Sequence, residues 1–371
     1  MKDIYYLFSS ISFLQFYIPI VIEANKNGYN NSFILKKQLD CKKYSCPYSM
    51  VNNNILMNYT SKYDITILHS TKINLKEIKG TVFMIDGDIY GAAARTLLNN
   101  SLLNKLNKEN TIRISLPEHI NFIHIYHHYI KNVNYCFFCN KNILNQKIEL
   151  SDKEKKMCNP DSFNKKFVDF SKSFKNDKNI FLGNTKFDNI ASINEILRKF
   201  SLDKNQKYCL FMFPKVINNV DESSIIGVYS HLHKLNYKVI VKTRPKNEVK
   251  ENLRGDIYVS SDIYPNESLE LMKISNLCII SSSSAIDETI FSSIPCIDIV
   301  SDVRSWGRND YMKDSKVYYK LYEWNISFNN FNDIIKNLEL KNSKYFGVLK
   351  QKYLFTHNNS AKKYIEFIET L

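Results

Sequence analysis

The 371 residues of the chain are enough for two domains of ordinary length, and a hydrophobic content of 44% is sufficient for two cores. The 51 basic and 37 acidic residues leave a net charge of +14, which favours anionic partners without choosing among nucleotides, phosphorylated acceptors, acidic lipid and nucleic acid. The 8 cysteines are scattered and several lie in apolar runs, which indicates a reducing compartment and a cytoplasmic location.

The N-terminal run from Ile4 to Ile22 carries no charge over a length that could span a bilayer. Several serines and Pro19 interrupt it, and it divides into a strand (IYYLFSS), a turn and a helix that Gly28 would end. No small-residue cleavage site follows. We therefore expect the strand–turn–helix opening of an α/β domain, with a membrane span as the alternative.

Short apolar strands alternate with helical patterns through the first half, which is typical of stacked βαβ units. Helices are predicted at Gly91–Asn104 and Phe163–Phe174. Cys136 and Cys139 have the spacing of a zinc site, but no second pair or histidine cluster completes a tetrahedral set, so packing is favoured over zinc. The predicted strands are Ile4–Phe8, Ser32–Leu35, Asp64–Leu68, Thr81–Ile85, Thr111–Ser115, Tyr135–Phe138 and Asn179–Leu182.

The second half repeats the alternation, so two domains are predicted, residues 1–182 and 183–371, which join near Gly183–Ser201. A final helix from about Asn359 to Leu371 has apolar residues on one face, so it should dock, and it can cross back to the first domain. The predicted strands of this half are Tyr208–Phe213, Lys238–Lys242, Asp256–Val259, Asn276–Ile280 and Pro295–Ile299.

The sequence SSSSAIDE, Ser281–Glu288, directly follows one of these strands. Where a parallel strand turns into a helix, unpaired backbone N–H groups and the helix dipole favour phosphate. Small hydroxyl residues suit such a turn because they cap the helix, let a diphosphate approach the backbone and add O–H donors. Asp287 and Glu288 then lie on the first helical turn, where a carboxylate can accept ribose hydroxyls. The alternative is an ordinary capped helix that binds no ligand.

The stretch ISNLCIISSSSAIDETIFSSIPCIDI resembles the corresponding part of GT-B enzymes, in particular UDP-N-acetylglucosamine 2-epimerases and CDP-glycerol glycerophosphotransferases. FLGNTKFDNI is similar to the G-N-x-x-x-D stretch that closes their first domain, and KYCLFMFPK and IVKTRPKN are similar to strands of their second. The similarity covers roughly Phe181 to Val300. It implies an α/β fold of the GT-B type, with two Rossmann-like domains facing across a cleft, an N-terminal acceptor domain and a C-terminal domain that binds a nucleotide sugar.

The resemblance also implies roles for individual residues of the second domain. Ser282, Ser283 and Ser284 would contact the diphosphate, and Glu288, together with Asp287, would contact the ribose. Arg244 and Lys246 can add cationic contacts to the phosphates, a solvated basic turn being the alternative.

The first domain should supply the acceptor site and the base. His119 follows a predicted strand and is the candidate base, with Glu118 beside it as the alternative. Asp86 and Asp88 can hold an acceptor hydroxyl or simply form a turn. His124 and His128 have the i, i+4 spacing of metal ligands, but no third ligand accompanies them, so no metal role is assigned.

Missing motifs bear on the choice of reaction. GDIYGAAARTLL resembles a segment of the 2-epimerases, but their Gly-Thr-Arg-Pro-Glu opening and His-x-x-Ala-Gly motif are absent, which counts against epimerisation. The Trp-His-Gly and His-Pro elements of the glycerophosphotransferases are absent too. The second domain has no Asp-x-Asp cluster at the phosphate turn, so we expect neither a metal nor another cofactor.

The sequence thus favours a GT-B glycosyltransferase of polysaccharide biosynthesis that moves a sugar or polyol-phosphate from a nucleotide donor to a glycan or lipid-linked acceptor. A lipid-linked acceptor would bring peripheral association with a membrane. The alternative is a UDP-sugar 2-epimerase or hydrolase, which needs only the donor. A nucleic-acid partner is not expected, because no basic helix or aromatic-basic motif accompanies the charge.

Overall fold

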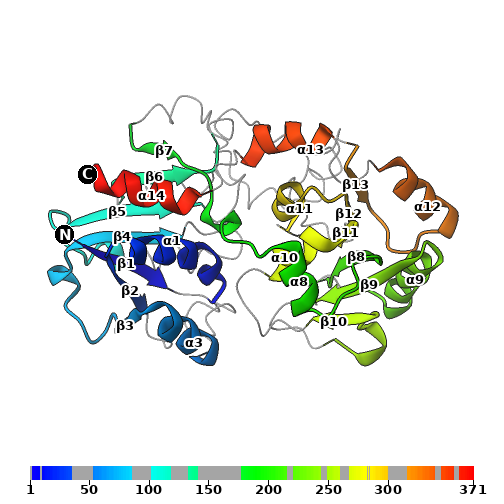
Figure 1. The fold of residues 1–371 in the computed structure, drawn as a ribbon, viewed down its shortest axis with the longest axis horizontal. Helices are drawn as coiled ribbons and strands as arrows, with labels where there is room; N and C mark the ends of the chain where they lie inside the picture. The colour runs from blue at the N-terminus through cyan, green and yellow to red at the C-terminus, as the bar shows by residue number, and fades with distance from the viewer. Residues whose placement is uncertain are drawn as a thin grey trace, which may run out of the picture. The chain divides into compact units, whose positions relative to one another are not determined.

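The computed structural model of the protein describes residues 2–8, 11–35, 53–85, 102–117, 133–140, 177–214, 220–243, 249–259, 267–281, 283, 285–299, 316–338, 344–354 and 359–371. These residues form two compact units, which are described separately (Figure 1). The first unit draws its described residues from Met1–Asn145, Asp169–Asn189 and Tyr353–Leu371, and the second draws them from Ile190–Lys352.

Within the described residues, the first unit contains a seven-stranded sheet with the order β3-β2-β1-β4-β5-β6-β7. Every neighbouring pair is parallel. The predicted strands of this half are confirmed to within two residues at each end. They are β1 (Asp3–Phe8), β2 (Asn30–Leu35), β3 (Ile65–His69), β4 (Gly80–Ile85), β5 (Thr111–Leu116), β6 (Tyr135–Phe138) and β7 (Asn179–Phe181).

The uncharged N-terminal run folds as the sequence predicts, into β1, a 3-10 turn η1 (Ile11–Phe13) and helix α1 (Leu14–Lys26). Most of its residues are buried in the first unit, so the lack of charge reflects burial in a protein core. None of the described helices has the length and apolar character needed to cross a membrane.

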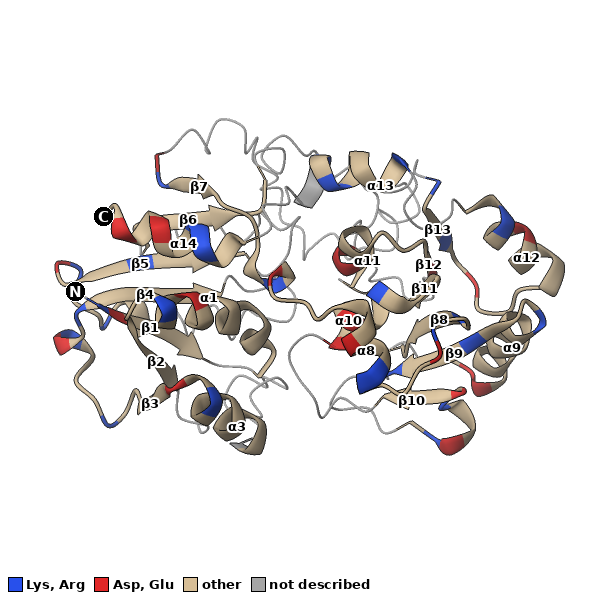
Figure 2. Ribbon diagram, in the orientation of Figure 1, with Lys and Arg blue, Asp and Glu red and all other residues tan. Residues whose placement is uncertain are grey.

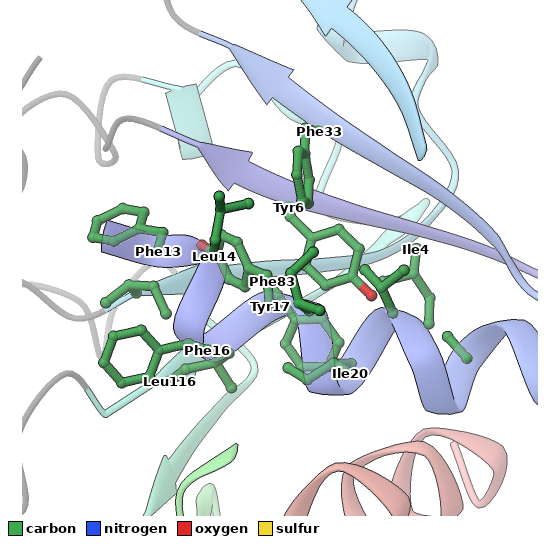
Figure 3. Close-up of a cluster of buried hydrophobic side chains, with 14 of the residues drawn as sticks. Ile4, Tyr6, Phe13, Leu14, Phe16, Tyr17, Ile20, Phe33, Phe83 and Leu116 are labelled. Carbon is green, nitrogen blue, oxygen red and sulfur yellow. The ribbon is translucent and has the colours of Figure 1, made fainter. Parts of the chain in front are cut away.

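The core between this sheet and α1 is aromatic (Figure 3). Tyr6 lies with its ring centroid 5.0 Å from that of Tyr17 and 5.7 Å from that of Phe83, and Phe8 stacks on Phe33 at 4.9 Å. The buried tyrosine hydroxyls are satisfied, since Tyr6 donates to Asn31 Oδ1 (2.8 Å) and Tyr17 donates to the Leu7 carbonyl (2.9 Å). Buried hydroxyls without such partners would cost free energy.

The last helix, α14 (Ser360–Glu369), belongs to the first unit and lies beside α1 (Figure 1). Its Tyr364 is fully buried, with its ring centroid 4.5 Å from that of Phe137. The Tyr364 hydroxyl donates to the Gly183 carbonyl at 2.7 Å. The helix therefore fills part of the first core, although the chain passes through the second unit before reaching it.

The G-N-T-K-F-D stretch, 183–188, ties several segments of the first unit together. Thr185 Oγ1 donates to the Phe16 carbonyl at 2.7 Å, and Asn184 Nδ2 donates to the Pro117 carbonyl at 3.2 Å. Asp188 accepts hydrogen bonds from the Ala361 N–H (2.7 Å) and the Asn359 N–H (3.3 Å) at the start of α14. Burial raises the pKa of the Asp188 carboxyl, and the backbone hydrogen bonds partly offset this effect.

The described part of the second unit contains a six-stranded sheet with the order β10-β9-β8-β11-β12-β13, again parallel throughout. The five predicted strands are confirmed with shifts of one residue at their ends. The edge strand β13 was not predicted, because its sequence YYKL is short and contains a lysine. The strands are β8 (Lys207–Met212), β9 (Tyr237–Lys242), β10 (Ile257–Val259), β11 (Leu277–Ile280), β12 (Cys296–Ile299) and β13 (Tyr318–Leu321).

Helices cover both faces of this sheet. Phe211 packs in one cluster with buried residues of α9 and α12, while α10 and α11 contribute buried residues of their own. The helices and helical turns not yet bounded are α3 (Asn53–Tyr63), η2 (Leu75–Glu77), η4 (Thr185–Phe187), α8 (Ile193–Lys199), α9 (Glu222–Lys234), η6 (Glu251–Leu253), α10 (Glu267–Ile274), α11 (Ile286–Ser292), α12 (Phe328–Asn337), α13 (Lys344–Leu349) and η8 (Lys350–Leu354). Apart from the end of Gly91–Asn104, the two helices predicted in the first half lie outside the described residues.

Candidate nucleotide site

The strand order of the second sheet indicates the edge at which a ligand would bind. β8 is central. The next two strands in the chain, β9 and β10, lie in order on one side of it, and the following three, β11, β12 and β13, lie in order on the other side. Ligands of such sheets bind at the carboxyl ends of the strands, next to the point where the direction reverses. That point lies between β8 and β11. Ser281 follows the last residue of β11, so the serine segment, residues 281–284, begins at this edge.

The described serines of this segment are buried, Ser281 at 3% and Ser283 at 6% exposure. Ser283 Oγ accepts a hydrogen bond from the Ala285 N–H (3.3 Å), and its carbonyl accepts one from the Ile286 N–H (3.4 Å). The expectation that a serine caps the next helix is wrong for the described residues. The N-cap of α11 is Ala285, which already has helical backbone angles, so Ser283 lies two residues too early.

Asp287 and Glu288 lie in the first turn of α11, as the sequence predicts. Both side chains are buried, with 6% and 8% exposure. Both residues make contacts within the protein, and acids in a first helical turn also interact favourably with the helix dipole. Their assignment to a ribose stays a prediction.

A buried ion pair that the sequence analysis did not identify lies at the same edge. Lys242, the last residue of β9, places its Nζ 2.8 Å from Oε2 of Glu267, the first residue of α10. Their side chains are 5% and 2% exposed. The signal that could have identified the pair is Lys242, which directly follows the apolar run Val239–Val241, because a lysine buried in a sheet needs a partner.

The second unit carries further buried acidic groups, and Figure 2 shows acidic residues on α10 and α11. Glu270, one turn after Glu267 on α10, accepts from Lys199 Nζ of α8 at 2.5 Å. Burial raises the pKa of the Glu267 carboxyl, while the nearby ammonium of Lys242 acts in the opposite direction. In β12, the fully buried Asp298 accepts from the Tyr318 hydroxyl at 3.0 Å.

No protein-family model matches the chain, and no curated protein matches it significantly in sequence. Solved structures do match it over its full length. UDP-GlcNAc 2-epimerase from Neisseria meningitidis bound to UDP-GlcNAc is 14% identical, with a TM-score of 0.59 and 100% of both chains covered. The wall teichoic acid polymerase TagF is 14% identical, with a TM-score of 0.58 and 100% of this chain and 88% of that chain covered. MurG from Acinetobacter baumannii is 7% identical, with a TM-score of 0.51 and 100% of both chains covered.

The chain has a GT-B fold. The resemblance expected from the serine segment is thereby confirmed at the level of fold, and it extends over the first unit, where sequence similarity was weak. The two parallel sheets of the GT-B chain have the same order in their first six strands. At these identities the likeness concerns the fold alone.

Several predicted site residues of this GT-B chain lie outside the described residues. The described residues stop at Pro117, directly before Glu118 and His119. The roles of all these residues remain predictions. They are Asp86, Asp88, Glu118, His119, His124 and His128 of the first domain, and Arg244, Lys246, Ser282 and Ser284 of the second.

The cysteines whose positions are described are all buried free thiols. Cys136 and Cys139 lie in the first unit, and among the described residues no group of three or more His, Cys, Asp or Glu could hold a metal ion. Cys278 of β11 and Cys296 of β12 are direct partners in the sheet register. Burial raises the pKa of the Cys296 thiol, so it has the character of a packing residue and not of a nucleophile.

Proposed function

We propose that this GT-B chain is a transferase that moves a sugar or polyol-phosphate from a nucleotide-activated donor to a glycan or lipid-linked acceptor. The observation that carries the proposal is the position of the serine segment. It starts directly after β11, beside the point where the strand order of the second sheet reverses. The fold of the whole chain is similar to that of enzymes that use nucleotide-activated substrates. Buried acids in the next helix turn add the carboxylates that a ribose requires.

The proposed reaction needs no covalent bond between the protein and the substrate. The nucleotide phosphate leaves as an anion, so the site has to stabilise developing negative charge. Backbone N–H groups and serine hydroxyls of the serine segment would supply this, with Arg244 and Lys246 as cations. The acceptor hydroxyl needs a base within hydrogen-bond reach, and His119 is the candidate, with Glu118 and Asp88 as alternatives. We expect the reaction to proceed without a metal or another cofactor.

Calorimetry with UDP, CDP, GDP and CMP, followed by turnover assays with the corresponding activated sugars and polyols, tests the proposal. A transferase should bind at least one nucleotide and consume the donor faster when a glycan or lipid-linked acceptor is added. Binding to none of these nucleotides would overturn the proposal.

His119→Ala should lower turnover roughly 100-fold with donor affinity little changed, since general-base catalysis contributes about that much.

A 2-epimerase or hydrolase is the second candidate, because structures of UDP-GlcNAc 2-epimerases are among those that match the whole chain. The absence of the Gly-Thr-Arg-Pro-Glu and His-x-x-Ala-Gly motifs counts against epimerisation. The same assay separates the two activities. Conversion of UDP-GlcNAc in the absence of any acceptor would favour the epimerase, and strict dependence on an acceptor would favour the transferase.

A further inference from the structure

The two carboxylate oxygens of Glu267 have different surroundings. Oε2 lies 2.8 Å from Lys242 Nζ. Both oxygens are buried without a hydrogen bond of normal geometry within the described part of the chain, so the ion pair is the contact that holds Oε2, and Oε1 has no hydrogen-bond partner. A buried charged oxygen without a partner costs more free energy than a hydrogen bond normally returns, so this arrangement is expensive unless a ligand completes it.

The position of Glu267 follows from the topology of the second unit. All strands are parallel, β10 ends at the carboxyl edge, and α10 then leads back to β11, so its first residue starts at that same edge. Lys242 is the partner of Met212 in the register between β9 and the central β8. Because β8 also pairs with β11, Glu267 stands on the edge where the serine segment begins. Helices α10 and α11 also contact each other.

The neighbouring ion pair shows what a purely structural pair looks like on the same helix. Glu270 is 8% exposed and accepts from Lys199 at 2.5 Å, and neither of its oxygens is left buried without a partner in the described structure. Lys199 itself is 35% exposed, so this pair lies closer to solvent. Replacing a buried ion pair with apolar residues often leaves stability unchanged or increases it, so Lys242 and Glu267 are not explained by stability alone.

We infer that Glu267 is a nucleotide-binding residue whose free oxygen accepts a hydrogen bond from a hydroxyl or N–H group of the nucleoside part of the donor, with Lys242 holding the carboxylate in place. The inference rests on the proposed function and deepens it, because it adds a carboxylate on α10 to the acids of α11. A carboxylate only accepts hydrogen bonds when ionised, so its ligand partner must be a donor, either a ribose hydroxyl or a base N–H.

Calorimetric titration of the nucleotide that the parent binds best, combined with thermal unfolding, tests this inference. Glu267→Gln should weaken binding about tenfold or more, the loss expected for one hydrogen bond to a charged group, while Glu270→Gln, the matched control, should stay within about twofold of the parent.

Titration with the 2′-deoxy and 3′-deoxy nucleotides identifies the group of the nucleotide that donates the hydrogen bond to Glu267. If a ribose hydroxyl binds Glu267, one deoxy compound should bind the parent and Glu267→Gln equally. If a base N–H does, both deoxy compounds should keep the full difference between the two proteins.

A double variant, Lys242→Met with Glu267→Leu, covers the case in which Glu267→Gln fails to fold. It should keep or raise the melting temperature while nucleotide affinity stays at least about tenfold below the parent. Parent-like affinity in this double variant would overturn the inference, since the pair would then be only structural. If the parent binds no nucleotide at all, the proposed function fails and this inference falls with it. If the parent binds and Glu267→Gln binds equally well, the inference alone is wrong.

Discussion

The two sheets share the order of their first six strands but differ in what they bury. The first unit packs aromatic rings against α1 and closes its core with α14 (Figure 3). The described part of the second unit has a core richer in aliphatic side chains and buries several acids around the carboxyl ends of its strands. Two sheets with the same strand order thus support different cores, one rich in aromatic rings and one with aliphatic side chains and buried acids.

In two units of shared topology, buried polar groups indicate where a ligand site would lie. Aromatic packing contributes stability directly, whereas buried carboxylates reduce it unless partners compensate them. Glu267, Asp287 and Glu288 belong to the second unit and lie at helix starts next to strand ends. Buried charge at these positions, more than strand order, distinguishes the unit for which nucleotide binding is proposed.

The largest effect is expected from Tyr364→Ala, which removes an α14 side chain from the first core. The free energy of unfolding of the first unit should fall by about 3–5 kcal/mol, the usual cost of deleting a buried aromatic side chain. Urea unfolding followed by hydrogen exchange at the β6 amides would measure it. Tyr364→Phe is the matched control and should lose only about 1 kcal/mol, the hydrogen bond to Gly183. Equal stability of Tyr364→Ala and the parent would show that α14 does not complete this core.

Asp188→Ala should come next, because it removes the carboxylate that accepts hydrogen bonds from the Asn359 and Ala361 N–H groups at the start of α14. A loss of about 3 kcal/mol in the free energy of unfolding is expected, since hydrogen bonds to a charged group are stronger than neutral ones. Asp188→Asn is the control and should retain more stability. If Asp188→Ala lowers the free energy of unfolding by less than an ordinary surface substitution does, the hydrogen bonds between Asp188 and α14 do not stabilise the first unit.

The same pair of variants gives a pH dependence. Burial raises the pKa of Asp188, so as pH rises through about 4 the unfolded chain releases this proton before the folded protein does. Ionisation of Asp188 therefore lowers stability with rising pH. The stability of the parent relative to Asp188→Asn should decline from about pH 4 towards neutral, and urea unfolding at several pH values would measure it. A relative stability that rises over this range would mean that the hydrogen bonds outweigh burial.

A smaller effect concerns the second unit. Glu288→Ala should weaken nucleotide binding by about 1.5–3 kcal/mol, the value of one charge-assisted hydrogen bond to ribose. Calorimetry would measure the loss, and circular dichroism would check that the fold persists. Equal affinity in the variant and the parent would remove Glu288 from the site and leave Glu267 as the leading carboxylate.

The smallest effect is expected at Cys278, which lies fully buried in β11. Cys278→Ala should cost about 1 kcal/mol, because a buried thiol behaves as a small apolar group. Cys278→Ser should cost more, since it buries a hydroxyl. Thermal unfolding of both variants would measure the difference. A serine variant as stable as the alanine variant would show that this position offers a polar partner.

Much of the fold could be predicted from the sequence because it depends on local pattern. The apolar runs predicted twelve of the thirteen strands described, but the short β13 offered no such run. Partners distant in the chain could not be predicted. The hydrogen bond from Ala361 to Asp188 joins residues 173 positions apart, and the Lys242–Glu267 pair depends on which helix returns to which strand. The serine cap was wrong because the backbone at Ala285 is already helical.

The docking of α14 on the first unit also sets an order of events during synthesis. The first unit leaves the ribosome early, yet Tyr364, Ile365 and Ala361 of its core emerge only after the whole second unit has been made. Until then, Phe137 and Phe83 lack the contacts that Tyr364 of α14 makes with them. The second unit can complete its own sheet without waiting. We expect the domain that is translated second to finish folding first, and the nascent first unit to depend on chaperones that shield exposed aromatic surface.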